Sequence, residues 1–225
     1  MEYPKIVKSV FESRPNRFIA HVRINGKLER VHVKNTGRCK ELLVPGCTVY
    51  LSQSDNPARK TAYDLVTVQK GGRLINMDAQ APNAAVKEWL IAGGIPGVTV
   101  IRPEFTYDQS RFDFYLERSG RRAFLEVKGV TLEENGVVYF PDAPTLRGTK
   151  HLHELVKAKE EGYDAYIFLC IQMENVDHFE PNRRTDPDFA DALVDAQKNG
   201  VKLLAYDCKV TPSSMQIGKK IEIRL

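Results

Sequence analysis

The sequence predicts an α/β (α+β) fold in two parts, a small β-barrel or sandwich followed by a mixed sheet flanked by helices. Two observations support this prediction. Short strand-like segments, separated by turns rich in Gly, Pro and Asn, fill roughly the first 80 residues. The order that follows is one helix, three strands, helix, strand, helix and strand, which is typical of helices packed on a mixed sheet.

A hairpin is the first predicted element and covers residues 17–34. Apolar side chains alternate along one face of its first strand, at Phe18, Ala20, Val22 and Ile24. Asn25-Gly26 then supplies the positive φ angles that a tight hairpin turn requires. A short helical piece over residues 40–43 and strands over 48–51, 65–68 and 74–75 complete the first part.

The pattern changes at Pro82-Asn83, which predicts a boundary between domains 1–80 and 81–225. Asn83 is expected to cap a helix that Gly93-Gly94 ends. The second part then contains strands over 99–107, 111–117 and 123–130, the last two joined by a Ser119-Gly120 turn. It continues with a helix over 149–160, a buried strand over 163–171, a helix from Asp186-Pro187 to Asn199-Gly200, and a strand over 201–206.

Composition indicates a cytoplasmic protein without a membrane segment. The N-terminus lacks the apolar stretch of a secretory signal, and the longest apolar run, residues 166–171, is too short to cross a bilayer. The four cysteines form no C-x-x-C pair, so we expect small buried side chains rather than a zinc site or disulfides.

The charge is unevenly distributed. Residues 1–80 contain 14 Lys and Arg against 7 Asp and Glu, whereas the remainder contains 19 against 22. A basic N-terminal third can neutralise nucleic-acid phosphates, although many surfaces that bind nothing carry a similar charge.

Three charged residues stand in otherwise apolar strands: Asp113, Glu126 and Lys128. Side chains two positions apart in a strand share a face, so Glu126 and Lys128 point together, and pairing across the Ser119-Gly120 turn brings Asp113 close to them. Buried charges of this kind need a partner, and two carboxylates suit Mg²⁺, with Mn²⁺ as an alternative. The spacing alone is equally compatible with a buried salt bridge.

The string Asp113…Glu126-Val127-Lys128 resembles the PD-(D/E)xK nuclease signature, and the flanking sequence is similar to the sugar fermentation stimulation protein A family. The similar blocks are residues 35–46, 59–61, 110–114, 126–132 and 140–155. The resemblance implies an OB-like barrel followed by a restriction-endonuclease-like domain, with catalytic Asp113, Glu126 and Lys128 and with DNA as the ligand. RNA is retained as an alternative. Cys39 and Gly129 depart from the family pattern, in which Met and Ser are expected.

Further residues are candidates for supporting roles. Arg147 and Lys150 lead into a predicted helix whose N-terminal N–H groups favour a phosphate. His151 is a candidate proton carrier or outer partner of the metal site, and Glu88 and Glu104 are candidate additional acids. In the barrel, loop cations are expected to follow a phosphate backbone. The complete set of predicted nucleic-acid-binding residues is Arg38, Lys40, Arg59, Lys60, Arg111, Arg147 and Lys150.

Three functions remain open at the level of sequence. The first is a Mg²⁺-dependent nuclease, and the second is a non-catalytic DNA-binding regulator of sugar metabolism genes with a vestigial metal site. The third is a hydrolase of a small phosphorylated metabolite, which would require a closed pocket instead of a groove. The sequence does not determine the oligomeric state, homodimer included.

Overall fold

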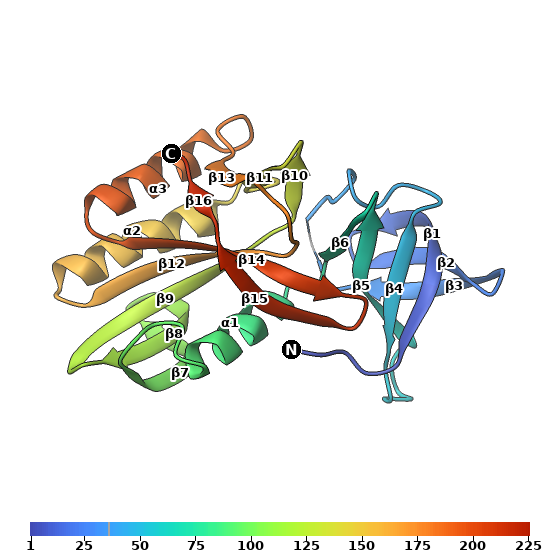
Figure 1. Ribbon diagram of the computed structural model, residues 1–225, viewed down its shortest axis with the longest axis horizontal. Coiled ribbons are helices and arrows are strands. Elements are labelled where there is room, and N and C mark those ends of the chain that lie inside the picture. Colours follow the sequence, from blue (N-terminus) through green and yellow to red (C-terminus); the bar gives the residue numbers. More distant parts are fainter. Residues whose placement is uncertain (36) are drawn as a thin grey trace.

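A computed structural model describes residues 1–35 and 37–225, and it contains a barrel followed by two sheets with three helices (Figure 1). The barrel strands are β1 (Ile6–Asn16), β2 (Ile19–Ile24), β3 (Lys27–Val33), β4 (Thr48–Gln53), β5 (Tyr63–Lys70) and β6 (Arg73–Asn76). The central sheet and helices are α1 (Ala81–Ile91), β7 (Val98–Tyr107), β8 (Ser110–Arg118), β9 (Arg121–Val130), α2 (Leu146–Glu160), β12 (Asp164–Ile171), α3 (Pro187–Lys198), β14 (Lys202–Thr211) and β15 (Ser214–Lys220). A small third sheet contains β10 (Leu132–Glu134), β11 (Val137–Phe140), β13 (His178–Pro181) and β16 (Glu222–Ile223).

The first five strands close a barrel. Strand β1 pairs with both β2 and β4, and the circle is completed where β3 pairs in parallel with β5 at His32↔Asp64 and Val33↔Leu65. This connectivity is that of an OB barrel, so the predicted fold class is confirmed. The predicted β2–β3 hairpin is also confirmed, because Asn25 and Gly26 have φ angles of 49° and 81°, as a tight turn requires.

The central sheet is mixed and has six strands in the order β15-β14-β12-β9-β8-β7. Strand β12 is parallel to both β9 and β14, and all its residues are buried, as predicted for a strand covered on both faces. Its side chains alternate between two cores: Ile167 and Leu169 pack with Leu152 and Leu155 of α2, and Phe168 packs on the α1 side. Helices α1 and α2 therefore cover opposite faces of the sheet.

Three local predictions were wrong. Residues 40–43 form a turn in place of a helical piece, closed by bonds from the N–H groups of Leu42 and Leu43 to the Cys39 carbonyl. Helix α1 begins at Ala81, so Asn83 lies inside its first turn, and its side chain is used elsewhere. Helix α2 begins at Leu146, three residues earlier than expected, because Thr145 caps it by accepting a bond from Gly148 N.

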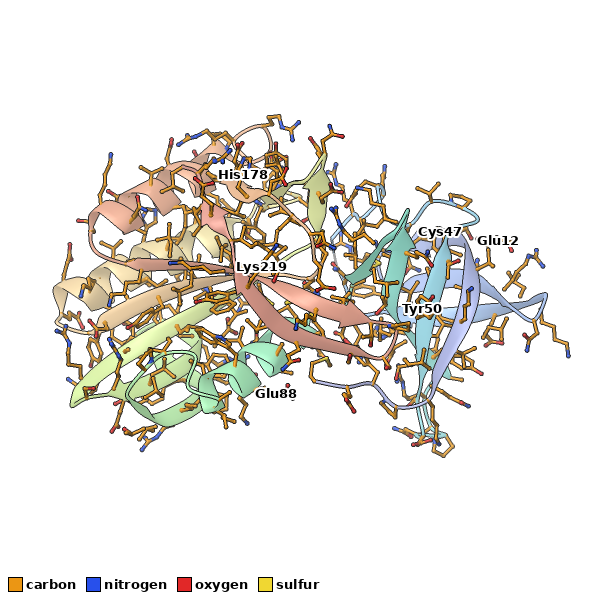
Figure 2. All side chains as sticks on the ribbon, in the orientation of Figure 1. Glu12, Cys47, Tyr50, Glu88, His178 and Lys219 are labelled. Carbon is orange, nitrogen blue, oxygen red and sulfur yellow. The ribbon has the colours of Figure 1, made fainter. Side chains whose placement is uncertain are left out.

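The cysteines are all free. Cys39, Cys170 and Cys208 are buried, as predicted, whereas Cys47 is half-buried near the start of β4 (Figure 2). Within the described residues, no helix has the length and apolar content needed to cross a membrane.

Polar contacts join the barrel to the rest of the chain. Lys70 at the end of β5 binds the Glu133 carboxylate of β10 at 2.8 Å, and Arg73 of β6 binds the same group at 3.0 Å. Buried Gln172 donates to the Asn76 and Asp78 carbonyls, which precede α1. These contacts hold the barrel against β10 of the third sheet and against the end of β12 in the central sheet.

Candidate active site

Strands β8 and β9 separate at the position of the two predicted acids. Their pairing runs from Arg118↔Arg121 to Phe114↔Leu125 and stops there. Asp113 and Glu126 are the next residues along each strand, and the Asp113 Oδ2 accepts a hydrogen bond from the Val127 N–H at 2.7 Å. The end of the paired region therefore places two carboxylates together at an opening in the sheet.

Glu126 is 3% exposed, and its hydrogen-bond donors among the described residues bind one of its two carboxylate oxygens. Its Oε1 accepts hydrogen bonds from Lys128 Nζ at 2.6 Å and from His151 Nδ1. Burial raises the pKa of the Glu126 carboxyl, but the His151 bond and the Lys128 charge outweigh burial, so the pKa is lowered overall. Its Oε2 is buried and has no hydrogen-bond partner among the described residues, which leaves an ionised oxygen available for a ligand.

Asp113 has the opposite electrostatic environment. Burial, and after it the negative charge of Glu126, raises the pKa of the Asp113 carboxyl despite its bonds to Val127 N and to Asn83 Nδ2, the latter at 2.7 Å. Two carboxylates that repel each other in a partly buried site favour binding of a cation between them. Asn83 was not predicted as a site residue, because its position at a helix start is equally typical of a cap.

A cavity of about 290 Å³ opens beside Asp113. Glu104 lies opposite Asp113, between the strand pairs Pro103↔Phe114 and Phe105↔Phe112, in the left-handed region with a φ of 55°. Arg111 lies 3.6 Å from the Glu104 carboxylate. The lining residues are Asn83, Ala84, Lys87, Pro103, Glu104, Asp113 and Phe114, so the accessory candidate Glu104 lies at the site. Lys87 was not anticipated from the sequence.

The other two accessory candidates have different positions. His151 is 3% exposed and contacts Glu126 directly, while Arg147 Nε donates to its Nε2 at 3.4 Å, which places the ring proton on the Nδ1 that faces Glu126. Glu88 is not brought to the site. It extends from α1 (Figure 2), and its carboxylate binds the N-terminal ammonium of Met1 at 2.6 Å.

The donor set fits a hard divalent cation that keeps part of its water shell. Within residues 1–35 and 37–225, no three His, Cys, Asp or Glu side chains are arranged as a metal cage. Mg²⁺ does not require one, since it binds through one or two carboxylates and completes its shell with water and substrate oxygens. Asp113 and the unpartnered Oε2 of Glu126 are the ligands that this structure offers.

Within the described part of the chain, some of the predicted nucleic-acid-binding cations have a carboxylate partner and others have none. Arg38 and Lys40 are exposed and line a second cavity, described below. Arg59 is instead held by both oxygens of Asp64, and Lys60 is exposed. Lys150 lies 3.6 Å from Glu154 on α2. Arg111 and Arg147 lie next to the acidic site through Glu104 and His151.

Two family models match this chain. The model described as the SfsA N-terminal OB domain matches residues 13–77, and the one described as the sugar fermentation stimulation protein RE domain matches residues 80–214. A sugar fermentation stimulation protein homolog from Ruminiclostridium cellulolyticum is 53% identical over 226 residues and covers 100% of both chains. A homolog from Desulfitobacterium hafniense is 54% identical over 225 residues, covering 100% of this chain and 99% of its own.

A solved structure has the same fold. The Pyrococcus furiosus SfsA structure, described as a complex with Ca²⁺, superposes with a TM-score of 0.91 at 28% identity, and the match covers 100% of this chain and 98% of that one. The predicted resemblance is thus confirmed by sequence and by structure. This chain belongs to the sugar fermentation stimulation protein family.

Proposed function

We propose that this protein is a divalent-metal-dependent nuclease that hydrolyses phosphodiester bonds, with DNA as substrate and Mg²⁺ as the ion. Mn²⁺ and RNA are the respective alternatives. The observation that carries the proposal is the pairing of Asp113 with the unpartnered Oε2 of Glu126 at the opening between β8 and β9. Ca²⁺ in the Pyrococcus furiosus relative supports the choice of a hard divalent cation.

The side chains have distinct tasks in this proposal. Asp113 and Glu126 hold the ion, which when bound supplies Lewis-acid polarisation of a phosphoryl oxygen. Lys128, whose side chain is 13% exposed, keeps its ammonium against Glu126 and can balance negative charge that develops on the phosphate. Asn83 and His151 position the two carboxylates from opposite faces of the sheet, through α1 and α2.

A second candidate function is nucleic-acid binding without cleavage. The observation that favours it is the group of exposed barrel cations, including Arg38 and Lys40, that form no ion pair within the described part of the chain. Such cations bind phosphates whether or not the acidic site is active. Both candidate functions therefore predict binding of nucleic acid, and they differ in whether the bound nucleic acid is cleaved.

The test is incubation of purified protein with labelled single-stranded, duplex and branched DNA and with RNA, in Mg²⁺, Mn²⁺ or EDTA. Glu126→Gln is the most informative variant, since its amide oxygen still accepts bonds from Lys128 and His151 while the charge at the Oε2 position is lost. Asp113→Ala and Lys128→Ala complete the set. Glu160→Gln, an exposed glutamate on α2, is the matched control.

We expect cleavage by the wild-type protein and by Glu160→Gln in Mg²⁺, a loss of at least about 100-fold in Glu126→Gln and Asp113→Ala, and no cleavage in EDTA. Binding with no turnover on every substrate would instead support the non-catalytic candidate. Equal cleavage by wild type and Asp113→Ala would remove the acidic pair from the reaction.

A further inference from the structure

We infer that the barrel contains a preorganised phosphate-binding pocket, formed around Arg14, Arg17, Arg38 and Lys40, that anchors the nucleic acid next to the acidic site. This inference rests on the proposed function, because it takes the ligand to be a nucleic acid. It adds two residues, Arg14 and Arg17, that the sequence did not indicate, and it assigns the anchoring to this pocket instead of the loop that contains Arg59 and Lys60.

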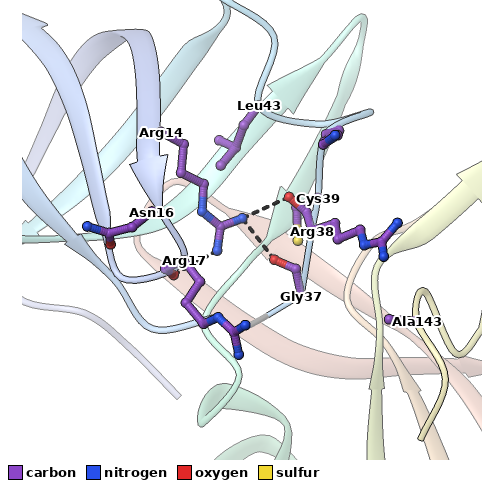
Figure 3. A pocket seen from close by; sticks show the side chains of 9 residues that line it. Arg14, Asn16, Arg17, Gly37, Arg38, Cys39, Leu43 and Ala143 are labelled. Atoms are coloured by element: carbon purple, nitrogen blue, oxygen red, sulfur yellow. Dashed lines mark hydrogen bonds between the residues drawn. The ribbon is translucent and has the colours of Figure 1, made fainter.

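The pocket has a volume of about 430 Å³. Its lining residues are Arg14, Asn16, Arg17, Gly37, Arg38, Cys39, Lys40, Leu43 and Ala143 (Figure 3). Four of these carry a positive charge and none carries a negative one. Within residues 1–35 and 37–225, none of the four cations lies within ion-pair distance of a carboxylate, whereas Arg59, Lys34, Lys70 and Arg73 all do. The pocket therefore has a positive charge that an anionic ligand would neutralise.

Arg14 holds the backbone of the pocket in place through its guanidinium group. Its Nη1 donates to the carbonyls of Gly37 and Arg38, both at 2.9 Å, as the dashed lines in Figure 3 show. Its Nη2 donates to the carbonyls of Arg17 and Asn35, at 2.8 and 2.5 Å. One guanidinium thus ties the β1–β2 turn to the loop that follows β3. Arg14 is a positioning residue, and the exposed Arg17, Arg38 and Lys40 remain for the ligand.

The second part of the chain holds the same loop from the other side. Asp142 Oδ2 accepts a hydrogen bond from Arg38 N at 3.1 Å, and a Cβ added to Gly37 would lie 2.5 Å from that oxygen. Ala143, the next residue, lines the pocket. This segment leads within a few residues to Arg147 at the start of α2, which contacts His151 and through it Glu126. Residues 142–147 therefore connect the pocket to the side chains that contact Glu126. A pocket fixed from both sides loses little entropy on binding.

The chemistry of the pocket favours phosphate over a metal or a nucleophilic reaction. Burial, then the charges of Asp142 and Glu41, raises the pKa of the Cys39 thiol to about 12, so this thiol stays neutral and is a poor metal ligand and nucleophile. The remaining polar groups are chiefly guanidinium and ammonium donors. Guanidinium forks match the oxygens of a phosphate, and the ammonium of Lys40 adds a point charge.

The test measures binding of labelled single-stranded DNA to the full chain by fluorescence anisotropy in EDTA, across a series of salt concentrations. EDTA removes cleavage from the readout, so a protein that binds but does not cut still tests the pocket. Two exposed residues are replaced, in Arg17→Ala, Arg38→Ala and the double variant. Lys8→Ala is the matched control, because Lys8 is exposed on barrel strand β1 and lies outside the pocket.

We expect each single variant to lower the slope of log affinity against log salt by about 0.7, and the double variant by about 1.4, with no change in Lys8→Ala. Unchanged slopes in the pocket variants, or an equal loss in Lys8→Ala, would overturn the inference. Oligonucleotides with and without a 5′-phosphate distinguish the source of the phosphate. If the pocket variants lose affinity only for the 5′-phosphorylated oligonucleotide, the pocket binds a terminal phosphate. If they lose affinity equally for both oligonucleotides, the pocket binds the phosphate backbone.

Discussion

Asn83 Nδ2 donates a hydrogen bond to Asp113 Oδ1 at 2.7 Å, and this bond joins helix α1 to the acidic site. The Val127 N–H binds the other Asp113 oxygen, so both oxygens of a half-buried carboxylate have a donor. These two bonds favour the ionised carboxylate against burial and against the neighbouring Glu126. Asn83 thereby fixes where the Asp113 carboxylate lies and supports its charge.

Replacement of Asn83 by alanine is expected to weaken metal binding and activity together. Residues that orient a ligand of a metal typically contribute 10- to 100-fold, so we expect a loss of about that size in cleavage and a matching rise in the Mg²⁺ concentration for half-maximal rate. Asn199→Ala is the control, since Asn199 is an exposed asparagine at the end of α3 whose side chain, among the described residues, hydrogen-bonds only to Asp195. Wild-type metal dependence in Asn83→Ala would contradict this role.

His151 is expected to matter through Glu126. His151→Ala removes the Nδ1–H donor from Oε1 and leaves Lys128 as the sole remaining donor to that oxygen among the described residues. We expect cleavage to fall by about 10- to 100-fold, with partial recovery in His151→Gln, which retains an N–H donor. The control is His153→Ala on the same helix, because His153 is exposed. Equal effects of the two alanine variants would show that only helix stability had changed.

Gly37 is expected to tolerate no side chain if the pocket is to keep its shape. A Cβ there would lie 2.5 Å from Asp142 Oδ2 and 2.9 Å from Asn35 Oδ1, so Gly37→Ala must displace these side chains or the loop itself, and Asp142 Oδ2 is the oxygen that accepts the bond from Arg38 N. We predict weaker DNA binding, measured by anisotropy, with an unchanged metal response. Gly72→Ala is the comparison in the same barrel, because a Cβ at Gly72 meets nothing within 4 Å. Unchanged DNA affinity in Gly37→Ala would show that the loop can adjust.

Glu133 is expected to make stability depend on acid pH. Burial raises its pKa, but the bonds from Lys70, Gly136 N and Arg73 outweigh burial and lower the pKa from 4.5 to about 2. Because the pKa of Glu133 is lower in the folded state, the ionised carboxylate stabilises the fold at pH values above its unfolded pKa of about 4.5. This stabilisation is lost as the pH falls from about 4.5 towards 2. Urea unfolding should show Glu133→Gln less stable than wild type by about 1–2 kcal/mol near neutral pH, after allowing for solvent screening.

The difference between the Glu133→Gln variant and wild type should shrink towards zero as the pH approaches 2. Glu134→Gln is the control, because Glu134 is the neighbouring glutamate and its contact with Arg184 is at the surface. A difference that stays constant with pH would mean that the contacts of Glu133 with Lys70 and Arg73 contribute no net charge stabilisation.

Local sequence patterns were sufficient for much of the fold. Asn25-Gly26 and Ser119-Gly120 fix their hairpins, because positive φ angles at two successive residues are a property of the turn itself. The apolar run of β12 identified a strand buried on both faces. Strands β1, β10, β11, β13, β15 and β16 were not predicted. Strands β10 and β11 form a hairpin around Asn135-Gly136, a turn signal of the same kind that the prediction did not use. Strands β13 and β16 pair with strands distant in sequence, which a local pattern does not reveal.

The sequence by itself determined that Asp113, Glu126 and Lys128 are chemically unusual, because charged side chains inside apolar strands are costly to bury without a partner. Only the tertiary structure decided how they are arranged. It separates β8 from β9 at these residues, brings Asn83 and His151 to them from opposite faces, and leaves Glu88 bound to the N-terminus. It also places Arg14 and Arg17 in the same pocket of the barrel as Arg38. Such contacts join segments tens of residues apart, and their geometry depends on how helices and strands pack, which local residue patterns do not specify.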